Sequence, residues 1–212
     1  MSGSLKALRS NCSTLANTSP RHSARRAFSI RKGNVSMRND NAKWAPAQGM
    51  SFDPHVTKNA TLKRVQPERQ TLLSGPFARL LEMINVSDAT GWPAPASGSS
   101  YALRLRRDRI LSVNGPPIEE GWHEASGCTV SDMTDGFAVI SLSGPDALTV
   151  LQRGTEINPA EPSASAARLF GSYGVILYAY GSDQTYRFHV QRAHLDGLWD
   201  LLQTYIQQAS ER

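Results

Sequence analysis

The amino-acid sequence predicts an α+β protein, in which a small subdomain with a β-hairpin is followed by an antiparallel sheet with helices on one face. Two observations carry this prediction. Residues 137–208 read as strand, helix, strand, strand and helix, and both helices have an apolar stripe that must be buried against another layer. Residues 101–113 read as two short strands joined by a tight turn. No internal repeat is visible.

One short helix is predicted in the first half, over residues 76–84. Proline fits the first turn of a helix, so Pro76 marks its start. The face that it buries is formed by Phe77, Leu80, Leu81 and Ile84. Residues 88–100 are rich in glycine, proline and serine and are predicted to be a loop.

The hairpin is predicted from the alternation of leucine and arginine. Leu103 and Leu105 point inward and Arg104 and Arg106 outward, because successive side chains of a strand lie on opposite faces. Residues 107–108 form the turn, and residues 109–113 return as the second strand. Residues 119–124 then form a short helix or a loop around Trp122.

The second half opens with a strand from Cys128, a turn, and a second strand over residues 137–142 that is covered on both faces. Gly144 and Pro145 end it and begin a helix with Leu148, Val150 and Leu151 on its apolar face. Strands follow over residues 168–170, 174–180 and 185–190, the last two as a hairpin. The final helix, residues 193–208, has one stripe, with Trp199 and Leu201 at its edges: Leu195, Leu198, Leu202, Tyr205 and Ile206.

The charge distribution divides the chain into a tail and a body. Residues 1–39 hold eight of the 23 basic residues and no acidic one; the rest hold 15 basic and 18 acidic residues, a net charge of −3. We expect a tail over 1–49, a linker or extended segment over 50–75, and a domain over 76–212 with subdomains at about 76–125 and 126–212. Because nucleic-acid binders carry their positive field on the folded part, we predict no nucleic-acid partner. No apolar run approaches the ~20 residues that span a bilayer, so we predict no membrane partner.

The tail is predicted to be disordered, because it has few large apolar side chains to bury. It is interpreted as a transit peptide, which Arg26-Ala-Phe-Ser29 supports, or as non-native sequence upstream of a start at Met37 or Met50. A basic docking arm is the third alternative. The expected location is cytoplasmic, or the mitochondrial matrix if the tail is a transit peptide.

Few residues suggest catalysis. His123 lies in a loop, His189 in a strand and His194 at the start of a helix, and we interpret all three as structural or solvent-facing. Cys12 and Cys128 predict neither a disulfide nor a metal site, and Cys128 is expected to be a small buried side chain. Ser143-Gly144 lacks the surroundings of a nucleophile, and no phosphate-binding loop is present. We therefore predict no catalytic residue and no metal ligand, and cofactor-binding residues stay unknown.

Three further groups have a structural and a functional interpretation. Asp132 and Asp135 flank a turn, which we favour over a cation site because no further oxygen ligand is near in sequence. The arginines of the hairpin form a solvated turn, or meet an acidic partner or anionic ligand: Arg104, Arg106, Arg107 and Arg109. Four tyrosines form core or a protein interface: Tyr173, Tyr178, Tyr180 and Tyr186.

Several motifs resemble those of a known superfamily. Leu142-Ser-Gly-Pro-Asp-Ala147 is similar to a signature of the aminomethyltransferase-like proteins, which include the glycine-cleavage T-protein and subunits of heterotetrameric sarcosine oxidase. Chain length and the second half favour the sarcosine oxidase gamma subunit family. Thr129-Val-Ser-Asp132 stands where that family has Asp-x-Ser-Asp. The motif near the C-terminus of that family is matched here by Phe188-His-Val190, Arg192, Leu198-Trp199 and Leu202. Of the family's hairpin motif, this sequence has only Leu105, Asp108 and Leu111.

The resemblance, which spans roughly residues 76–208, implies two packed α+β layers, a small one and a larger ferredoxin-like one. It implies a non-catalytic gamma-type subunit of a heterotetrameric sarcosine oxidase-like flavoenzyme complex, which oxidatively demethylates sarcosine to glycine. Its partners would be alpha, beta and delta subunits. The resemblance also implies that the partner subunits carry FAD, FMN, NAD, tetrahydrofolate and zinc, and that this chain alone binds none of them.

Other hypotheses remain open. The departures in the hairpin motif allow a related complex that acts on another N-methylated amine. A stand-alone folate-binding aminomethyltransferase-like protein would need a closed pocket with a carboxylate against the pterin ring, so a pocket with Asp132 or Asp135 would favour it. A nucleic-acid binder would depend on the tail alone. The subunit hypothesis also predicts an exposed aromatic and aliphatic face too large for a stable monomer.

Overall fold

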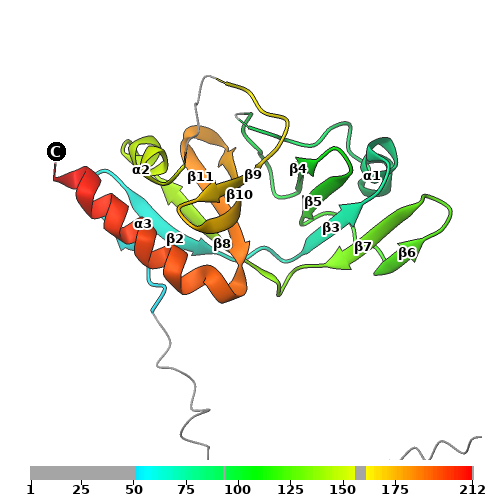
Figure 1. The fold of residues 1–212 in the computed structure, drawn as a ribbon, viewed down its shortest axis with the longest axis horizontal. Coiled ribbons are helices and arrows are strands. Elements are labelled where there is room, and N and C mark those ends of the chain that lie inside the picture. The colour runs from blue at the N-terminus through cyan, green and yellow to red at the C-terminus, as the bar shows by residue number, and fades with distance from the viewer. Residues whose placement is uncertain (1–50, 93, 156–160, 212) are drawn as a thin grey trace, which may run out of the picture. The chain divides into compact units, whose positions relative to one another are not determined.

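The computed structural model describes residues 51–92, 94–155 and 161–211, which belong to one compact unit that spans Gln48–Arg212. Two antiparallel sheets and three α-helices form within these ranges, which confirms the predicted α+β class (Figure 1). The predictions for the tail, residues 1–49, lie outside the described residues.

Sheet A has six strands in the order β1-β2-β8-β11-β10-β9, each antiparallel to its neighbours. Its strands are β1 (His55–Val56), β2 (Thr61–Val65), β8 (Phe137–Ser143), β9 (Ala167–Phe170), β10 (Tyr173–Tyr180) and β11 (Ser182–Gln191). Helix α2 (Ala147–Gly154) connects β8 toward β9 and β10, and a 3-10 turn (Arg192–His194) leads from β11 into α3 (Leu195–Ser210). The order β2-β8-β11-β10 with these two helices is ferredoxin-like, and β2 supplies its fourth strand from the N-terminal side.

Both α2 and α3 cover one face of sheet A (Figure 1). Val150 and Leu151 of α2 and Leu198, Trp199 and Leu202 of α3 are almost wholly removed from solvent. They pack against alternate residues of the strands: Leu62, Ile140, Leu142, Leu177, Phe188 and Val190. The apolar stripes of the two helices thus form the largest core, as their periodicity predicts.

Sheet B has five strands in the order β4-β5-β3-β7-β6. They are β3 (Gln70–Ser74), β4 (Tyr101–Arg106), β5 (Arg109–Val113), β6 (Gly121–His123) and β7 (Cys128–Asp132). Helix α1 (Phe77–Ile84) packs Leu80 and Ile84 on one face of this sheet, against Leu73, Ile110 and Val130. The helix at 76–84 and the hairpin at 101–113 are confirmed, and Cys128 is fully buried with a free thiol.

The remaining core lies between the two sheets. Leu103, Leu105, Leu111 and Val113 of sheet B join Ile176 and Tyr178 of sheet A in one buried cluster. Sheet A is therefore packed on both faces, by helices on one and in part by sheet B on the other. This explains why β8 and β10 read as nearly continuous apolar runs.

Four details differ from the sequence predictions. Residues 50–75, expected as a linker or extended segment, supply strands to both sheets, and residues 121–123, expected as helix or loop, form strand β6. The strands on either side of the Asp132 turn do not pair with each other: β7 belongs to sheet B and β8 to sheet A, so the passage between sheets lies at residues 133–136 rather than near 125. Trp199 is in the core and not at its edge.

Gly144 allows the tight passage from β8 to α2. Its φ is +117°, in the region that favours glycine, and a Cβ there would lie 2.3 Å from the carbonyl oxygen of Asn59. Gly144→Ala is therefore expected to lower the free energy of unfolding by about 2 kcal/mol, from backbone strain and the clash together. Urea unfolding monitored by circular dichroism measures this loss. Gly174→Ala, where a Cβ meets nothing within 4 Å, is the control; equal losses in both variants would contradict the steric account.

Candidate functional site

A buried chain of polar side chains joins the two sheets. Tyr101 of β4 and Gln70 of β3 belong to sheet B, whereas Tyr178 of β10 and Arg187 and His189 of β11 belong to sheet A. Consecutive members touch: Arg187 Nη1 and Tyr101 Oη are 2.9 Å apart, Tyr101 Oη and Tyr178 Oη 2.7 Å, Tyr178 Oη and His189 Nε2 2.8 Å, and His189 Nδ1 and Gln70 Oε1 2.6 Å. We call these five residues the polar relay.

The direction of each hydrogen bond in the polar relay follows from its two ends. Arg187 can only donate, so Tyr101 Oη accepts. At the other end, Gln70 Nε2 donates to the carbonyl oxygens of Thr134 and Phe137, which assigns Oε1 as the acceptor of the His189 Nδ1–H. His189 Nε2 then accepts from the Tyr178 O–H, and Tyr178 Oη accepts from the Tyr101 O–H. These two middle assignments rest on a neutral His189, which its burial favours by lowering its pKa to about 3, and with them every bond runs in the same direction.

Burial sets the acid–base properties of the relay. Loss of solvation, helped by the nearby Arg187 cation, lowers the pKa of His189 to about 3. Loss of solvation, together with the Tyr101 hydroxyl, raises the pKa of Tyr178 well above its ordinary 10. Proton transfer is efficient when the pKa of the acid or base lies near the working pH. Near neutral pH the relay therefore holds its protons, and its geometry suits the joining of two sheets rather than proton transfer.

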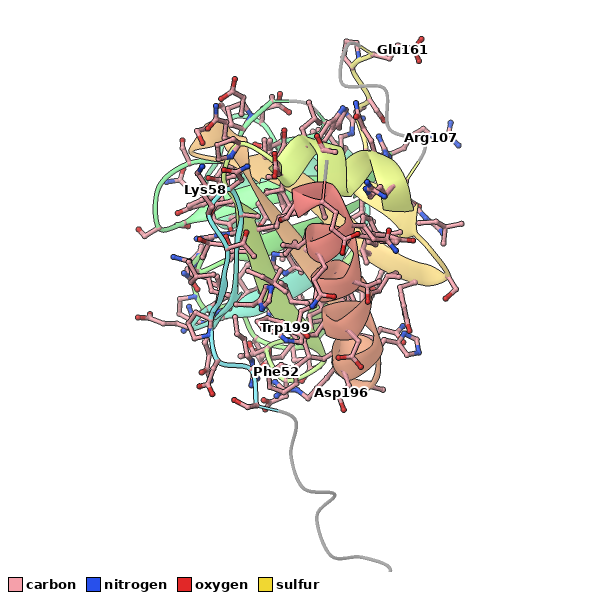
Figure 2. All side chains as sticks on the ribbon, turned by 90° about the vertical axis from the view of Figure 1, so that its left-hand side faces the viewer. Phe52, Lys58, Arg107, Glu161, Asp196 and Trp199 are labelled. Atoms are coloured by element: carbon pink, nitrogen blue, oxygen red, sulfur yellow. The ribbon has the colours of Figure 1, made fainter. Side chains whose placement is uncertain are left out.

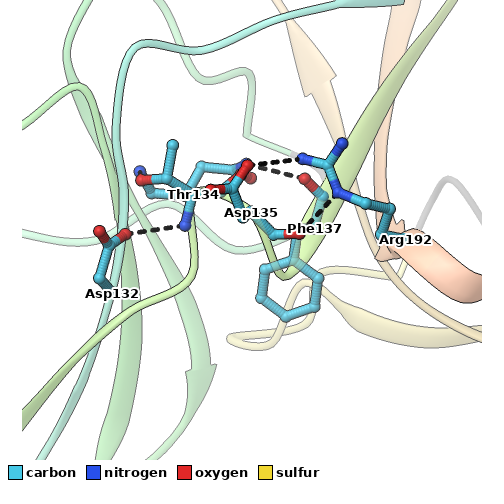
Figure 3. A network of polar contacts seen from close by, with 6 residues as sticks. Asp132, Thr134, Asp135, Phe137 and Arg192 are labelled. Carbon is cyan, nitrogen blue, oxygen red and sulfur yellow. Dashed lines mark hydrogen bonds and ion pairs between the residues drawn. The ribbon is translucent and has the colours of Figure 1, made fainter.

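The Asp132–Asp135 turn lies beside the inner end of the relay. Figure 3 shows that the two carboxylates point to different partners. Asp132 Oδ1 accepts from Thr134 N at 2.8 Å, and hydrogen bonds from Thr134 lower the pKa of this carboxyl group. Asp135 is bound by Arg192, whose Nε donates to the backbone oxygen at 2.6 Å and whose Nη2 lies 3.2 Å from Oδ1 (Figure 3). The two aspartates are turn residues, which agrees with the favoured interpretation.

The cavity next to this turn is too small for a cofactor. Asp135, Gln70 and Arg192 line a space of about 40 Å³, roughly the volume of one water molecule in the liquid. Ligand pockets usually measure about 300–1,000 Å³. A pterin ring therefore does not fit here, and this observation counts against the folate-pocket hypothesis.

Two larger hollows lie elsewhere. One, of about 680 Å³, lies between the end of α2 and β9 and is lined by Arg153, Arg168 and Leu169. The other, of about 330 Å³, is lined by Asp88, Trp92 and Arg104. Neither contains a histidine or a cysteine among its lining residues. Within the part of the chain that the structure describes, no cluster of three His, Cys, Asp or Glu residues could hold a metal ion.

The other residues considered as functional candidates do not come together in one site. His123 Nε2 lies 2.8 Å from the backbone oxygen of Glu119, and the ring of His194 packs near Tyr173. The hairpin arginines do not converge, since Arg104 lies over the Phe77 ring and Arg109 donates to Ser74. Of the four tyrosines, Tyr178 and Tyr186 are core residues on opposite faces of sheet A, which confirms a core role for these two.

The exposed apolar face expected of a subunit is not found among the described residues. Their exposed large hydrophobic side chains are Val56, Trp122 and Leu169. These lie on β1, β6 and β9, at three different sheet edges, and do not form one patch. None of the helices in the described ranges has the length and apolar character needed to cross a bilayer.

Sequence reasoning missed three members of the relay. Gln70 lies in a stretch without a clear pattern, and Tyr101 and Arg187 occupy ordinary strand positions. The alternation of β11 does contain one signal, because it places Arg187 and His189 on the same face, opposite the apolar Phe188 and Val190. A histidine on the covered face of a central strand needs polar partners, but the sequence does not say which residues they are.

Comparison with solved structures shows what the fold resembles. The chain is similar to a chain of the heterotetrameric sarcosine oxidase from Corynebacterium sp. U-96 in complex with pyrrole 2-carboxylate, with a TM-score of 0.57 and 17% sequence identity. The superposition covers 74% of this protein and 89% of that chain. At this identity the likeness shows a shared fold. A second structure, the glycine cleavage system aminomethyltransferase T from Bartonella henselae, matches with a TM-score of 0.46 and 13% identity over 68% of this protein and 45% of that chain.

No family model and no curated protein matches the sequence. The likeness to the sarcosine oxidase chain is therefore a likeness of fold.

Proposed function

We propose that the protein is a non-catalytic, gamma-type subunit of a heterotetrameric sarcosine oxidase-like flavoenzyme complex that demethylates sarcosine to glycine. One observation carries the proposal: the fold matches almost the whole length, 89%, of one chain of such a heterotetramer. That chain is thus similar in length to this protein, which contains its fold nearly complete.

The polar relay supports the same proposal. It fills part of the space between the sheets with hydrogen-bonded side chains, and three of its four hydrogen bonds cross from one sheet to the other: Arg187–Tyr101, Tyr101–Tyr178 and His189–Gln70. Buried hydrogen-bond networks favour one arrangement of the layers that they join; in this one, Arg187 Nε is the one buried side-chain polar atom without a hydrogen-bond partner among the described residues. A rigid pair of sheets suits a chain whose task is to hold neighbouring chains in place. FAD, FMN, NAD, tetrahydrofolate and zinc would then be bound by alpha, beta and delta subunits.

Two alternatives make different predictions. A related complex acting on another N-methylated amine would differ from the proposal only in its substrate. A stand-alone folate-binding protein would need a pocket, and the 40 Å³ cavity beside Asp135 does not supply it. Assays of the complex with several N-methylated amines distinguish the first alternative from the proposal. Titration of the purified chain with folate tests the second alternative, which predicts binding.

Purification from the source cells tests the proposal. The chain carries a C-terminal affinity tag, and the eluate is analysed by mass spectrometry and by absorbance at flavin wavelengths. We expect larger chains in a fixed ratio to the tagged chain, together with flavin absorbance and sarcosine-dependent reduction of oxygen. Elution of the tagged chain as a monomer without flavin would contradict the proposal.

A further inference from the structure

Strand β6 is the last strand of sheet B and pairs with β7 on one side. Figure 1 shows it at the end of the sheet that lies away from sheet A. The register of the pair joins Gly121 to Val130, Trp122 to Thr129 and His123 to Cys128. Because an edge strand presents backbone groups that have no partner strand, another chain can pair with it.

The hydrogen bonds of β7 show which backbone groups of β6 point outward. Met133 N donates to the backbone oxygen of Gln70 in β3 at 2.7 Å, and in an antiparallel pair every second residue bonds to the same neighbour. Residues 129 and 131 therefore also bond to β3, whereas residues 128 and 130 bond to His123 and Gly121 of β6. The N–H and C=O of Trp122, which lies between these two, point away from β7. In the described part of the chain, no backbone hydrogen bond of a turn or loop uses these two groups.

The side chain of Trp122 is open to a partner as well. Its exposed fraction is 64%, compared with 1% for Trp199 and 4% for Trp92. Thr129 and Ser74, the next residues along the same row of the sheet, are small, so the indole has no bulky neighbour on that side. Tryptophan is enriched among the residues that contribute most to binding at protein interfaces. One residue thus offers both unpaired backbone groups and an aromatic anchor.

The surroundings of β6 are acidic. Residues 110–152 contain six acidic residues and neither lysine nor arginine. Four of the six flank β6 or end β7, and all four are exposed: Glu119, Glu120, Glu124 and Asp132. The ion pairs found in the described ranges are Arg79–Glu82 and Arg192–Asp135, so none of these four carboxylates has a basic partner there. Arg109, which belongs to the same row of the sheet as Trp122, lies three strands away.

We infer that β6 is a docking edge for an extended, basic segment of a partner subunit. The inference rests on the proposed function, because the partner is a subunit of that complex. The segment adds a strand beside β6 and bonds to the outward N–H and C=O of Trp122. A lysine or arginine of the segment lies over the indole, since the face of an aromatic ring attracts a cation. The carboxylates around β6 steer the basic segment to this edge, although each exposed ion pair contributes little by itself.

Trp122→Ala tests the inference without disturbing the fold, because Trp122 belongs to none of the three core clusters. Leu169→Ala is the matched control, since Leu169 is 68% exposed on β9, an edge strand of sheet A. In purifications of the tagged chain from the source cells, we expect Trp122→Ala to weaken retention of the flavin-containing chains about tenfold. Leu169→Ala is expected to retain them as the wild type does. Urea unfolding of both variants verifies that each is folded.

A second measurement keeps this inference separate from the proposed function. The full chain, labelled with ¹⁵N, is titrated with acetyl-Val-Arg-Val-Arg-Val-amide and, separately, with acetyl-Val-Glu-Val-Glu-Val-amide. The basic peptide is expected to shift the backbone amide and indole N–H signals of Trp122 and to leave the amide signal of Leu169 in place. The acidic peptide is expected to shift neither. Because the readout is residue by residue, binding of a peptide elsewhere on the chain does not interfere.

The outcomes are distinguishable. If the wild type retains flavin-containing chains and Trp122→Ala retains them equally, the docking edge is wrong and the proposed function stands. If the wild type retains no such chains, the proposed function fails, and the peptide titrations decide whether β6 accepts a basic segment. Absence of shifts at Trp122 with the basic peptide, or equal shifts with both peptides, would overturn the docking edge in either case. Self-association of the purified chain that Trp122→Ala abolishes would also overturn it, because a second copy would then occupy β6.

Discussion

Acidification from pH 7 to pH 4 is expected to remove about 3 kcal/mol of unfolding free energy through His189 alone. The pKa of this histidine is about 3 in the folded protein and 6.5 in the unfolded chain. The unfolded chain therefore takes up the proton first as the pH falls. The stability that neutral His189 provides is fully present above pH 6.5 and is lost progressively between pH 6.5 and pH 3. Protonation would also place an N–H against the Tyr178 O–H and break the direction of the polar relay.

The comparison with His189→Gln isolates this effect. Glutamine does not titrate, and carboxylates contribute equally to both proteins. At pH 7 the variant is expected to be about 2 kcal/mol less stable, because Gln70 and Tyr178 lose well-placed partners in a buried site. Between pH 6.5 and pH 4 its stability should fall less steeply, so the two curves approach each other and cross near about pH 5. Urea unfolding at several pH values gives both curves; parallel curves would show that His189 is not buried in its neutral form.

Trp199→Ala is expected to lower the unfolding free energy by about 4 kcal/mol. The indole is 1% exposed in the core between α3 and sheet A, and Phe52 packs edge-on against it with ring centres 5.4 Å apart (Figure 2). Truncation removes the contacts of one of the two tryptophans in this core and leaves a cavity that the neighbouring strands cannot fill. The loss should appear as a lower urea midpoint with an unchanged slope.

Trp122→Ala is the matched control, since this tryptophan is 64% exposed on the edge strand β6. Substitutions at such positions usually change stability by less than about 0.5 kcal/mol. A loss at Trp122 as large as that at Trp199 would contradict the placement of the two indoles. A small loss at Trp199 would mean that α3 is not packed on sheet A as described.

The sequence predicted most elements of the fold because their patterns are local. The stripe of α3, the proline at the start of α1 and the alternation of β4 depend on neighbours a few residues away. The pairing of strands is not local. Residues 61–65 and 70–74 have weak patterns of their own, yet β2 and β3 are interior strands of the two sheets because they pair with strands far along the chain. The local residue pattern therefore does not predict which distant strands pair with each other or in which register.

Less of the candidate site, the polar relay, could be predicted from the sequence. His189 and Tyr178 were recognised as strand residues, but their polar partners Gln70 and Tyr101 lie 119 and 77 residues away. Only the packing of sheet A on sheet B brings them together.

The central claim is that this chain contributes shape and docking surface while its partners carry out the chemistry. Sarcosine oxidation measured side by side for the purified chain and for the complex isolated with it tests this claim most directly. The account predicts hydrogen peroxide formation by the complex and none by the chain alone at any concentration or after addition of FAD, FMN, NAD and tetrahydrofolate. Turnover of sarcosine by the purified chain would contradict it.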